Sequence, residues 1–346
     1  GYKMRDKILF LVIKLVVIFL ISSTQAYSQE ITIKLHHFLG TNSTTHKLFI
    51  VPWAKKIEEE SNGRIKINIF HSMQLGGKPQ QLIDQVREGF VEAVWTLPGY
   101  TPGRFPIVSV FELPFMITSA EATSQAVQEF SYKHLKEEFN DIHPIVFHVH
   151  ARGVIHSKKA IRSIEDLKGL SIRAPTKPIG DTIKELGGLP IFMPVPQVPE
   201  SLSRGVVNGA VIPWEVSLPL KVHELTNNHA EIGGDKGLYT AVFLLAMHKP
   251  TYEKMPSDLK KIIDNNSGIK LAKEVGKLWD DAEEIGRKAA LKRGNKIIEF
   301  DLNTVKKIKK TTKKIINKLI LNIDNKNSNG RQIFDDASKL VEKYSE

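Results

Sequence analysis

The stretch Asp166-Leu-Lys-Gly-Leu-Ser-Ile-Arg-Ala-Pro175 decides how this chain is organised. Gly169 ends a short helical segment, because glycine enters a left-handed turn without a steric penalty. Residues 170–173 then alternate apolar and polar side chains, which predicts a strand with one buried face. Pro175 ends that strand, since proline has no N–H to donate to a sheet.

This strand places Arg173 at its C-terminal end. Ligands of open α/β sheets bind at that edge, and a guanidinium offers two parallel donors that suit a carboxylate. The alternative is a structural salt bridge, and the strand alone does not decide between the two.

Length and composition limit the class of protein. A chain of 346 residues can bury a sizeable core and suggests about two domains. It contains no cysteine, which excludes disulfides, thiolate nucleophiles and cysteine metal sites.

The first 28 residues have the pattern of a signal peptide. Arg5 and Lys7 precede the apolar run 8–21, and small residues follow, with cleavage expected near Ala26 or Ser28. A membrane anchor is the alternative, but the run is short and Lys14 interrupts it. We therefore expect export to the periplasm.

The net charge of +11 does not by itself predict a nucleic-acid partner. Residues 1–28 hold four basic residues and one acidic one, so cleavage would leave +8. Export argues against nucleic acid, and the lysines of 306–314 alternate with apolar residues at helical spacing. We interpret them as a solvated helix face.

Strands and helices alternate from residue 31 onward, which predicts an α/β fold with a mostly parallel sheet. The run 269–293 would form a helix roughly 37 Å long, enough to lie across two lobes. The predicted division is 29–151 plus 240–268 for one lobe, 153–239 plus 294–346 for the other, and 269–293 as the bridge. Because no linker separates the lobes, extended crossings near 145–155 and 239–247 must exchange segments between them.

Enzyme motifs such as G-x-S-x-G, the P-loop and H-E-x-x-H are absent from the sequence. His148 and His150 lie on one side of an extended segment and could hold Zn²⁺ or Cu²⁺. A metal-binding receptor, and a secreted enzyme acting on a carboxylate, therefore remain alternatives. We expect no catalytic residue, cofactor or resident metal.

Several residues beside Arg173 are candidates for a ligand pocket, because small-molecule sites combine aromatic walls with a few polar groups. They flank strand ends, crossings or glycine-containing turns: Phe38, Tyr100, His150, Arg152, Phe192, Asn208, Trp214, Glu215 and Tyr239. The alternative for an isolated residue such as Trp214 is that it packs in the hydrophobic core and does not contact a ligand.

Seven segments, in this order, resemble the DctP-type receptors of TRAP (tripartite ATP-independent periplasmic) transporters. They are Ser61-Asn-Gly-Arg-Ile65, Gln74-Leu-Gly-Gly77, Phe111-Glu-Leu-Pro-Phe115, Ile164 to Pro175, Leu186-Gly-Gly-Leu-Pro190, Val207-Asn-Gly209 and Leu238-Tyr239. The resemblance spans about 30–294. It implies two α/β lobes of the periplasmic-binding-protein type, an interlobe cleft that closes on an organic acid, and delivery to a permease driven by an ion gradient. It also implies that Arg173 clamps the carboxylate.

Two differences between this sequence and the sialic-acid branch of the family narrow the expected class of ligand. The sialic-acid branch has a second arginine where this chain has Gly153, and a pocket asparagine where it has Ile212. The keto- and hydroxy-acid branch has a carboxylate and a tryptophan in this region, which Trp214-Glu215 match in reversed order. The resemblance therefore favours a small organic carboxylate over sialic acid.

Overall fold

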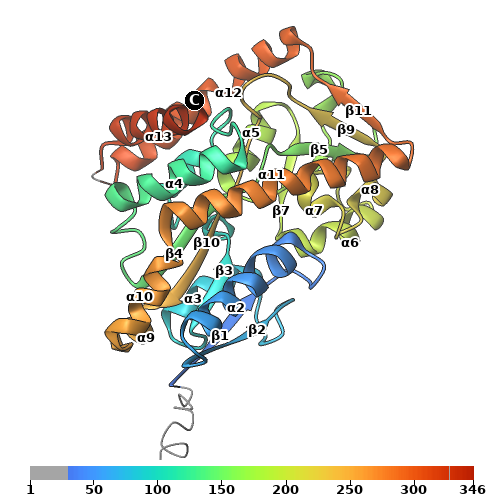
Figure 1. The fold of residues 1–346 in the computed structure, drawn as a ribbon. Helices are drawn as coiled ribbons and strands as arrows, with labels where there is room; N and C mark the ends of the chain where they lie inside the picture. Colours follow the sequence, from blue (N-terminus) through green and yellow to red (C-terminus); the bar gives the residue numbers. More distant parts are fainter. Residues whose placement is uncertain (1–29, 327) are drawn as a thin grey trace, which may run out of the picture.

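The computed structural model describes residues 30–326 and 328–346, which form two lobes, each built on one sheet (Figure 1). This confirms the predicted two-lobed α/β class. The predicted signal peptide, 1–28, lies outside the described residues.

The first sheet has the strand order β2-β1-β3-β10-β4. β1 pairs in parallel with β2 and β3, whereas β10 runs antiparallel to β3 and β4. Its strands are β1 (Ile31–His37), β2 (Ile65–Phe70), β3 (Ala93–Thr96), β4 (Ile142–Val149) and β10 (Val242–His248).

The second sheet has the order β11-β9-β5-β8-β6-β7. β6 pairs in parallel with β7 and β8, so these three strands end at the same edge. The strands are β5 (Val154–Ser157), β6 (Ser171–Ala174), β7 (Leu189–Phe192), β8 (Gly209–Ile212), β9 (Asn228–Glu231) and β11 (Lys296–Glu299).

Helices cover both sheets. They are α2 (Val51–Glu60), α3 (Leu82–Arg87), α4 (Ala120–His134), α5 (Lys177–Glu185), α6 (Val198–Ser203), α7 (Trp214–Ser217), α8 (Val222–Leu225), α9 (Lys249–Lys254), α10 (Ser257–Asn265), α11 (Gly268–Lys292), α12 (Leu302–Asp324) and α13 (Gly330–Ser345). One short helical segment before α2, Thr45–Ile50, contributes to the site.

The chain exchanges segments between the lobes. It leaves the first sheet after β4 and enters the second at β5, so the extended stretch 142–155 is divided between the two sheets. It returns through β10 and crosses again along α11 to β11.

The long helix α11 runs across both lobes (Figure 1) and contacts a helix of each. A Cβ on Gly276 would lie 2.4 Å from the Ala120 carbonyl oxygen, and one on Gly286 would lie 2.2 Å from that of Trp214. Asp280 accepts hydrogen bonds from the first backbone N–H groups of α4, at 2.8 and 2.9 Å. Glu283 accepts from those of α7. The helix therefore joins α4 of one lobe to α7 of the other.

The two helices of the C-terminal stretch pack in different places. α12 contacts α5, and its lysines reach that lobe through ion pairs such as Lys318 with Asp181 at 3.6 Å. α13 instead lies on α4, which covers β4 of the first sheet (Figure 1). We therefore propose that 294–326 belongs to the second lobe and α13 to the first, a change from the predicted assignment of 294–346.

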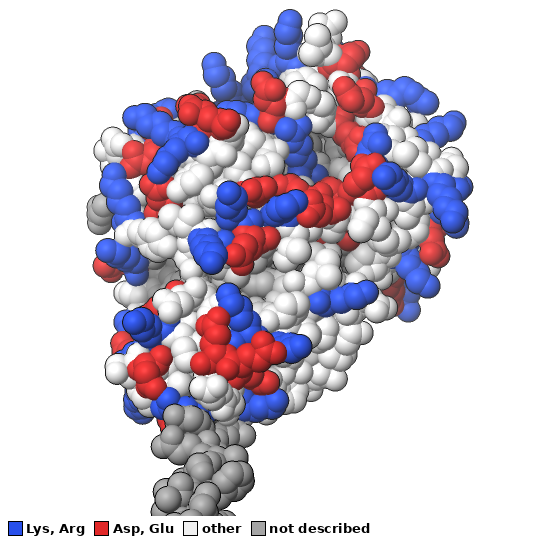
Figure 2. Space-filling model, viewed as in Figure 1, with Lys and Arg blue, Asp and Glu red and all other residues white. Residues whose placement is uncertain are grey.

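Among the described residues, no helix combines the length and apolar character needed to cross a membrane. On the face drawn in Figure 2, acidic and basic side chains alternate along α11. Lys277 pairs with Asp281 and Lys288 with Glu284 there.

Candidate functional site

A buried cavity lies between the lobes, at the edge where β6 and β8 end. The space in it that is open to the centres of water-sized spheres measures about 40 Å³. Six of the predicted site residues line it: Phe38, Tyr100, His150, Arg173, Glu215 and Tyr239. Because both lobes and their crossings supply lining residues, the cavity exists only when the lobes meet.

Arg173 enters the cavity from the end of β6 with part of its guanidinium already bound. Nε donates to the Met193 carbonyl oxygen at 3.0 Å, and Nη1 donates to that of Val211 at 3.1 Å. Nη2 is buried and has no hydrogen-bond partner among the described residues. The backbone beyond β7 and at β8 thus fixes the side chain and leaves one nitrogen for a ligand.

No carboxylate of the described chain pairs with Arg173, which is only 2% exposed. Burial lowers its pKa, while the hydroxyls of Tyr100 and Tyr239 beside it raise it. The Tyr239 hydroxyl also lacks a partner within this part of the chain. Because no carboxylate pairs with Arg173, a structural salt bridge does not explain why it is buried. A buried cation without a counter-ion is costly, which favours an anionic ligand here.

Aromatic rings form the wall on the side of the first lobe. Trp95 stacks on Phe243 with ring centroids 4.8 Å apart, and Phe38 lies 5.0 Å from Trp95. Trp279 joins them from the middle of α11. The sequence analysis did not single out Trp95, Phe243 or Trp279, although Trp279 lies within the predicted bridging helix, 269–293.

Glu215 lines the cavity from the first turn of α7. Its backbone N–H donates to Glu283 Oε1 at 2.8 Å, which ties it to α11. Its side chain is 5% exposed, and burial raises the pKa of this carboxyl to about 7, offset in part by hydrogen bonds from Thr44. One of its carboxylate oxygens, Oε1, has no partner in the described structure.

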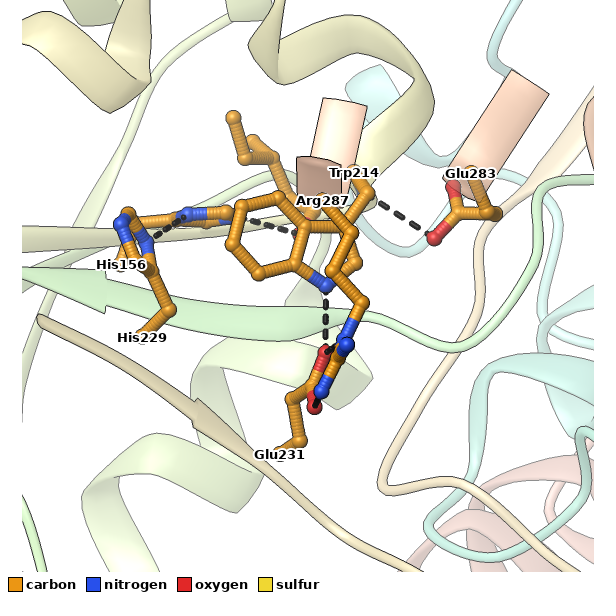
Figure 3. A network of polar contacts seen from close by, with 7 residues as sticks. His156, Trp214, His229, Glu231, Glu283 and Arg287 are labelled. Carbon is orange, nitrogen blue, oxygen red and sulfur yellow. Dashed lines mark hydrogen bonds and ion pairs between the residues drawn. The ribbon is translucent and has the colours of Figure 1, made fainter. Parts of the chain in front are cut away.

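Trp214 does not line the cavity, and the structure places it in a polar network of the second lobe (Figure 3). Its indole packs 4.9 Å from His156 and 4.7 Å from His229, between ring centroids. Its Nε1 donates to Glu231, which also pairs with Arg287 of α11. Successive residues of a helical turn face different directions, so Glu215 reaches the cavity while Trp214 faces this network.

Phe192 and Asn208 also lie outside the cavity. Phe192 is half exposed and packs over α5, where a Cβ on Gly180 would lie 2.3 Å from its ring. Asn208 precedes β8, and its Oδ1 accepts from the backbone N–H and hydroxyl of Ser171, both at 2.9 Å. It therefore lies at the opposite end of these parallel strands from Arg173.

Arg152 lies at a crossing but outside the cavity. Nε donates to the carbonyl oxygen of Thr118, and Nη1 and Nη2 donate to those of Gly234 and Asp235. These contacts join the first lobe to a loop of the second, and all three nitrogens of the guanidinium are used.

The neighbouring Gly153 is required by Tyr239. A Cβ at this position would lie 1.9 Å from the tyrosine ring, and Gly153 N–H donates to the Tyr239 carbonyl oxygen at 2.9 Å. Tyr239 thus fills the space beside Gly153 and offers the cavity a hydroxyl.

The histidines of the metal hypothesis are engaged by the protein. Trp95 Nε1 donates to His148 Nε2 at 2.9 Å, and Ala241 N–H donates to His150 Nε2 at 3.1 Å. Burial lowers the pKa of His148 to about 3 and that of His150 to about 4, so both are neutral. Within residues 30–326 and 328–346, no group of three or more His, Cys, Asp or Glu side chains is arranged to hold a metal. The metal alternative is not favoured.

Solved structures of solute-binding proteins share this fold closely. A TRAP solute-binding protein from Rhodoferax ferrireducens T118, in complex with copurified benzoate, is 41% identical with a TM-score of 0.89, over 91% of this chain and 98% of that one. A marine-metagenome TRAP solute-binding protein specific for aromatic acid ligands, with co-crystallised 3-hydroxybenzoate, is 43% identical with a TM-score of 0.90, over 92% and 100%.

Sequence comparison agrees. The chain is 24% identical to the outer membrane transporter protein TsaT of Comamonas testosteroni, over 89% of this chain and 91% of that protein. Residues 35–322 match the DctP model, described as bacterial extracellular solute-binding protein, family 7. The two lobes, the closed cavity and this match lead to one conclusion: the chain belongs to the DctP family of bacterial extracellular solute-binding proteins, the receptors of TRAP transporters.

Proposed function

We propose that this protein captures a small aromatic monocarboxylate in the periplasm. The ligand carboxylate accepts hydrogen bonds from Arg173 Nη2 and the Tyr239 hydroxyl, and the aromatic wall of Phe38, Trp95 and Phe243 holds its ring. The observation that carries the proposal is the buried Nη2 of Arg173, which has no partner among the described residues. An unpaired buried donor costs about 1–3 kcal/mol, which a carboxylate would recover.

An aromatic acid fits this cavity better than a keto acid, a hydroxy acid or sialic acid. Stacked indole and phenyl rings favour a flat apolar ligand through offset or edge contacts. The second arginine and the asparagine expected of a sialic-acid receptor are Gly153 and Ile212 here, and these side chains supply no donor or acceptor. The two 41–43% identical neighbours carry benzoate and 3-hydroxybenzoate, which supports the same class.

The closed cavity implies a cycle of opening and closing. Its polar lining residues are almost fully buried, so a ligand enters only if the lobes separate. Closing around the acid produces the form that is presented to the permease subunits of a TRAP transporter. The protein binds and releases the acid unchanged, since receptors of this family are not enzymes.

A ligand panel tests the proposal by differential scanning fluorimetry and calorimetry. We expect benzoate to raise the melting temperature, because a ligand bound only to the folded state stabilises by about 2.7 kcal/mol at a hundredfold excess over Kd. Benzamide has nearly the same shape without the charge and is the matched control; pyruvate, lactate and sialic acid test the other classes. Equal stabilisation by benzamide, or a preference for pyruvate or lactate, would overturn the proposal.

A further inference from the structure

Two more unpaired polar atoms line the same cavity. Oε1 of Glu215 and Oγ1 of Thr45 are both buried and have no hydrogen-bond partner among the described residues. Glu215 comes from the second lobe and Thr45 from the first, at the start of the helical segment Thr45–Ile50. Binding of a ligand carboxylate to Arg173 would still leave both atoms without a hydrogen-bond partner.

These two residues line the cavity from elements other than the strand that carries Arg173. Thr44, the residue before Thr45, hydrogen-bonds the Glu215 carboxyl through its side chain and backbone. Arg173 comes from β6 instead, and the hydroxyls of Tyr100 and Tyr239 lie beside its guanidinium. The cavity therefore has two sets of polar lining groups, one around Arg173 and one formed by Glu215 and Thr45.

Contacts with α11 and β9 hold Glu215 and the preceding Trp214 in position. Glu283 of α11 accepts the backbone N–H of both Trp214 and Glu215, at 3.1 and 2.8 Å, and Figure 3 shows the first of these contacts. The side chain of Trp214 is anchored in turn by Glu231. Glu215 is thus a fixed acceptor, set on a short helix that is tied to the bridging helix.

We propose that Glu215 and Thr45 bind a hydroxyl group on the ring of the aromatic acid, so that the preferred ligands are hydroxybenzoate-type acids. The hydroxyl donates its hydrogen to Glu215 Oε1 and accepts one from Thr45 Oγ1, which satisfies every polar atom involved. The inference rests on the proposed function, because it requires the carboxylate of the same ligand on Arg173.

The chemistry of the pair excludes other occupants of this end of the cavity. A second carboxylate would face Glu215 and Thr45, neither of which is a cation, so a dicarboxylate is disfavoured. An apolar group would leave two buried polar atoms unpaired, which is costly. A site built to bind a substrate hydroxyl discriminates strongly against the analogue that lacks it.

The test compares the affinities of benzoate, 3-hydroxybenzoate, 4-hydroxybenzoate and 3-aminobenzoate by calorimetry. We expect wild-type protein to bind one of the two hydroxybenzoates about tenfold or more tighter than benzoate. In Glu215→Leu and Thr45→Val, this ratio should fall to about threefold or less. The matched control is Glu138→Gln, because Glu138 is another carboxyl whose pKa burial raises to about 7, and it contacts the backbone of Ile107 and Val108 outside the cavity. This control should keep the wild-type ratio.

The outcomes separate this inference from the proposed function. If no aromatic acid binds the wild type, the proposed function fails. If benzoate binds as tightly as both hydroxybenzoates, only the hydroxyl inference fails. Tighter binding of 3-aminobenzoate than of either hydroxybenzoate would also overturn it, as would an unchanged ratio in a folded Thr45→Val or Glu215→Leu protein. Thr45→Val decides the matter if Glu215→Leu does not fold.

Discussion

Arg152 and Arg173 are two arginines at the junction of the lobes, and they differ in what their nitrogens contact. Burial lowers the pKa of both. Each of the three guanidinium nitrogens of Arg152 donates to a carbonyl oxygen, those of Thr118, Gly234 and Asp235. In Arg173 only two nitrogens, Nε and Nη1, donate to carbonyl oxygens, and the third, Nη2, has no partner among the described residues and belongs to a residue that lines the cavity. A buried arginine indicates a ligand only when the fold leaves one of its donors unused.

The largest expected effect on benzoate affinity comes from replacing Arg173, and the same substitution at Arg152 serves for comparison. Arg173→Ala should weaken benzoate binding by about 2–5 kcal/mol, because a buried charged pair loses one partner. At about 1.4 kcal/mol per tenfold, this corresponds to roughly 30-fold or more in Kd, measured by calorimetry. Arg173→Lys should also weaken binding, since lysine keeps the charge but loses the planar fork.

Arg152→Ala is the matched control for this comparison. It removes the contacts between Thr118 and the loop 234–235, so we expect it to lower stability by about 1–3 kcal/mol in urea unfolding. Its benzoate affinity should stay within about threefold of wild type. A folded Arg173→Ala protein with intact affinity, or an Arg152→Ala protein that loses binding, would contradict the distinction.

The next effect concerns Gly153, which follows Arg152 in the chain. In Gly153→Ala the new Cβ must displace the Tyr239 ring, and overpacking of this kind costs about 1–3 kcal/mol. Because Tyr239 supplies a hydroxyl beside Arg173, we expect both a lower melting temperature and weaker benzoate binding. Unchanged affinity would mean that Tyr239 takes no part in holding the carboxylate.

The pH dependence of binding tests the charge balance around Arg173. Burial raises the pKa of Glu215 to about 7, and burial together with Glu215 raises the pKa of Glu283 well above its ordinary value. Closing the cavity around an anion favours the protonated carboxyls, so binding takes up a proton. Benzoate affinity should therefore fall as pH rises above about 7, by at most about tenfold per pH unit for one proton.

Glu215→Gln provides the control for this pH series. It should flatten the affinity profile between pH 7 and 8.5, because the amide does not titrate. An equally steep profile in this variant would assign the proton to another group.

The smallest effect is expected at Trp214. Trp214→Phe removes the hydrogen bond to Glu231 but no cavity wall, so benzoate affinity should change less than about threefold. A ligand-induced change in tryptophan fluorescence should persist, because Trp95 and Trp279 line the cavity. Loss of the fluorescence change in Trp214→Phe would indicate that Trp214 does contact the ligand.

Local patterns in the sequence predicted much of this fold. Alternation gave the strand that carries Arg173, observed as Ser171–Ala174, and periodicity gave the bridging helix, observed as Gly268–Lys292. The partner of a helix cannot be predicted in this way. An amphipathic pattern shows that α13 buries one face, but it does not show that this face packs on α4.

The candidate site was only partly predictable for a related reason. Arg173, Phe38 and Tyr100, which were chosen for their positions near strand ends or turns, line the cavity, but such a position does not give the direction of each side chain. Trp214 and Glu215 are adjacent, and a rotation of about 100° around the helix separates the directions of their side chains. Trp95 and Trp279 were missed because a buried aromatic residue looks the same in sequence whether it faces core or cavity.

The most direct test of the central claim is a crystal structure of the protein with benzoate. We predict the carboxylate within hydrogen-bond distance of Arg173 Nη2 and the Tyr239 hydroxyl, with the ring against Trp95 and Phe243. Benzoate bound outside this cavity, or within it with the carboxylate turned away from Arg173, would contradict the account.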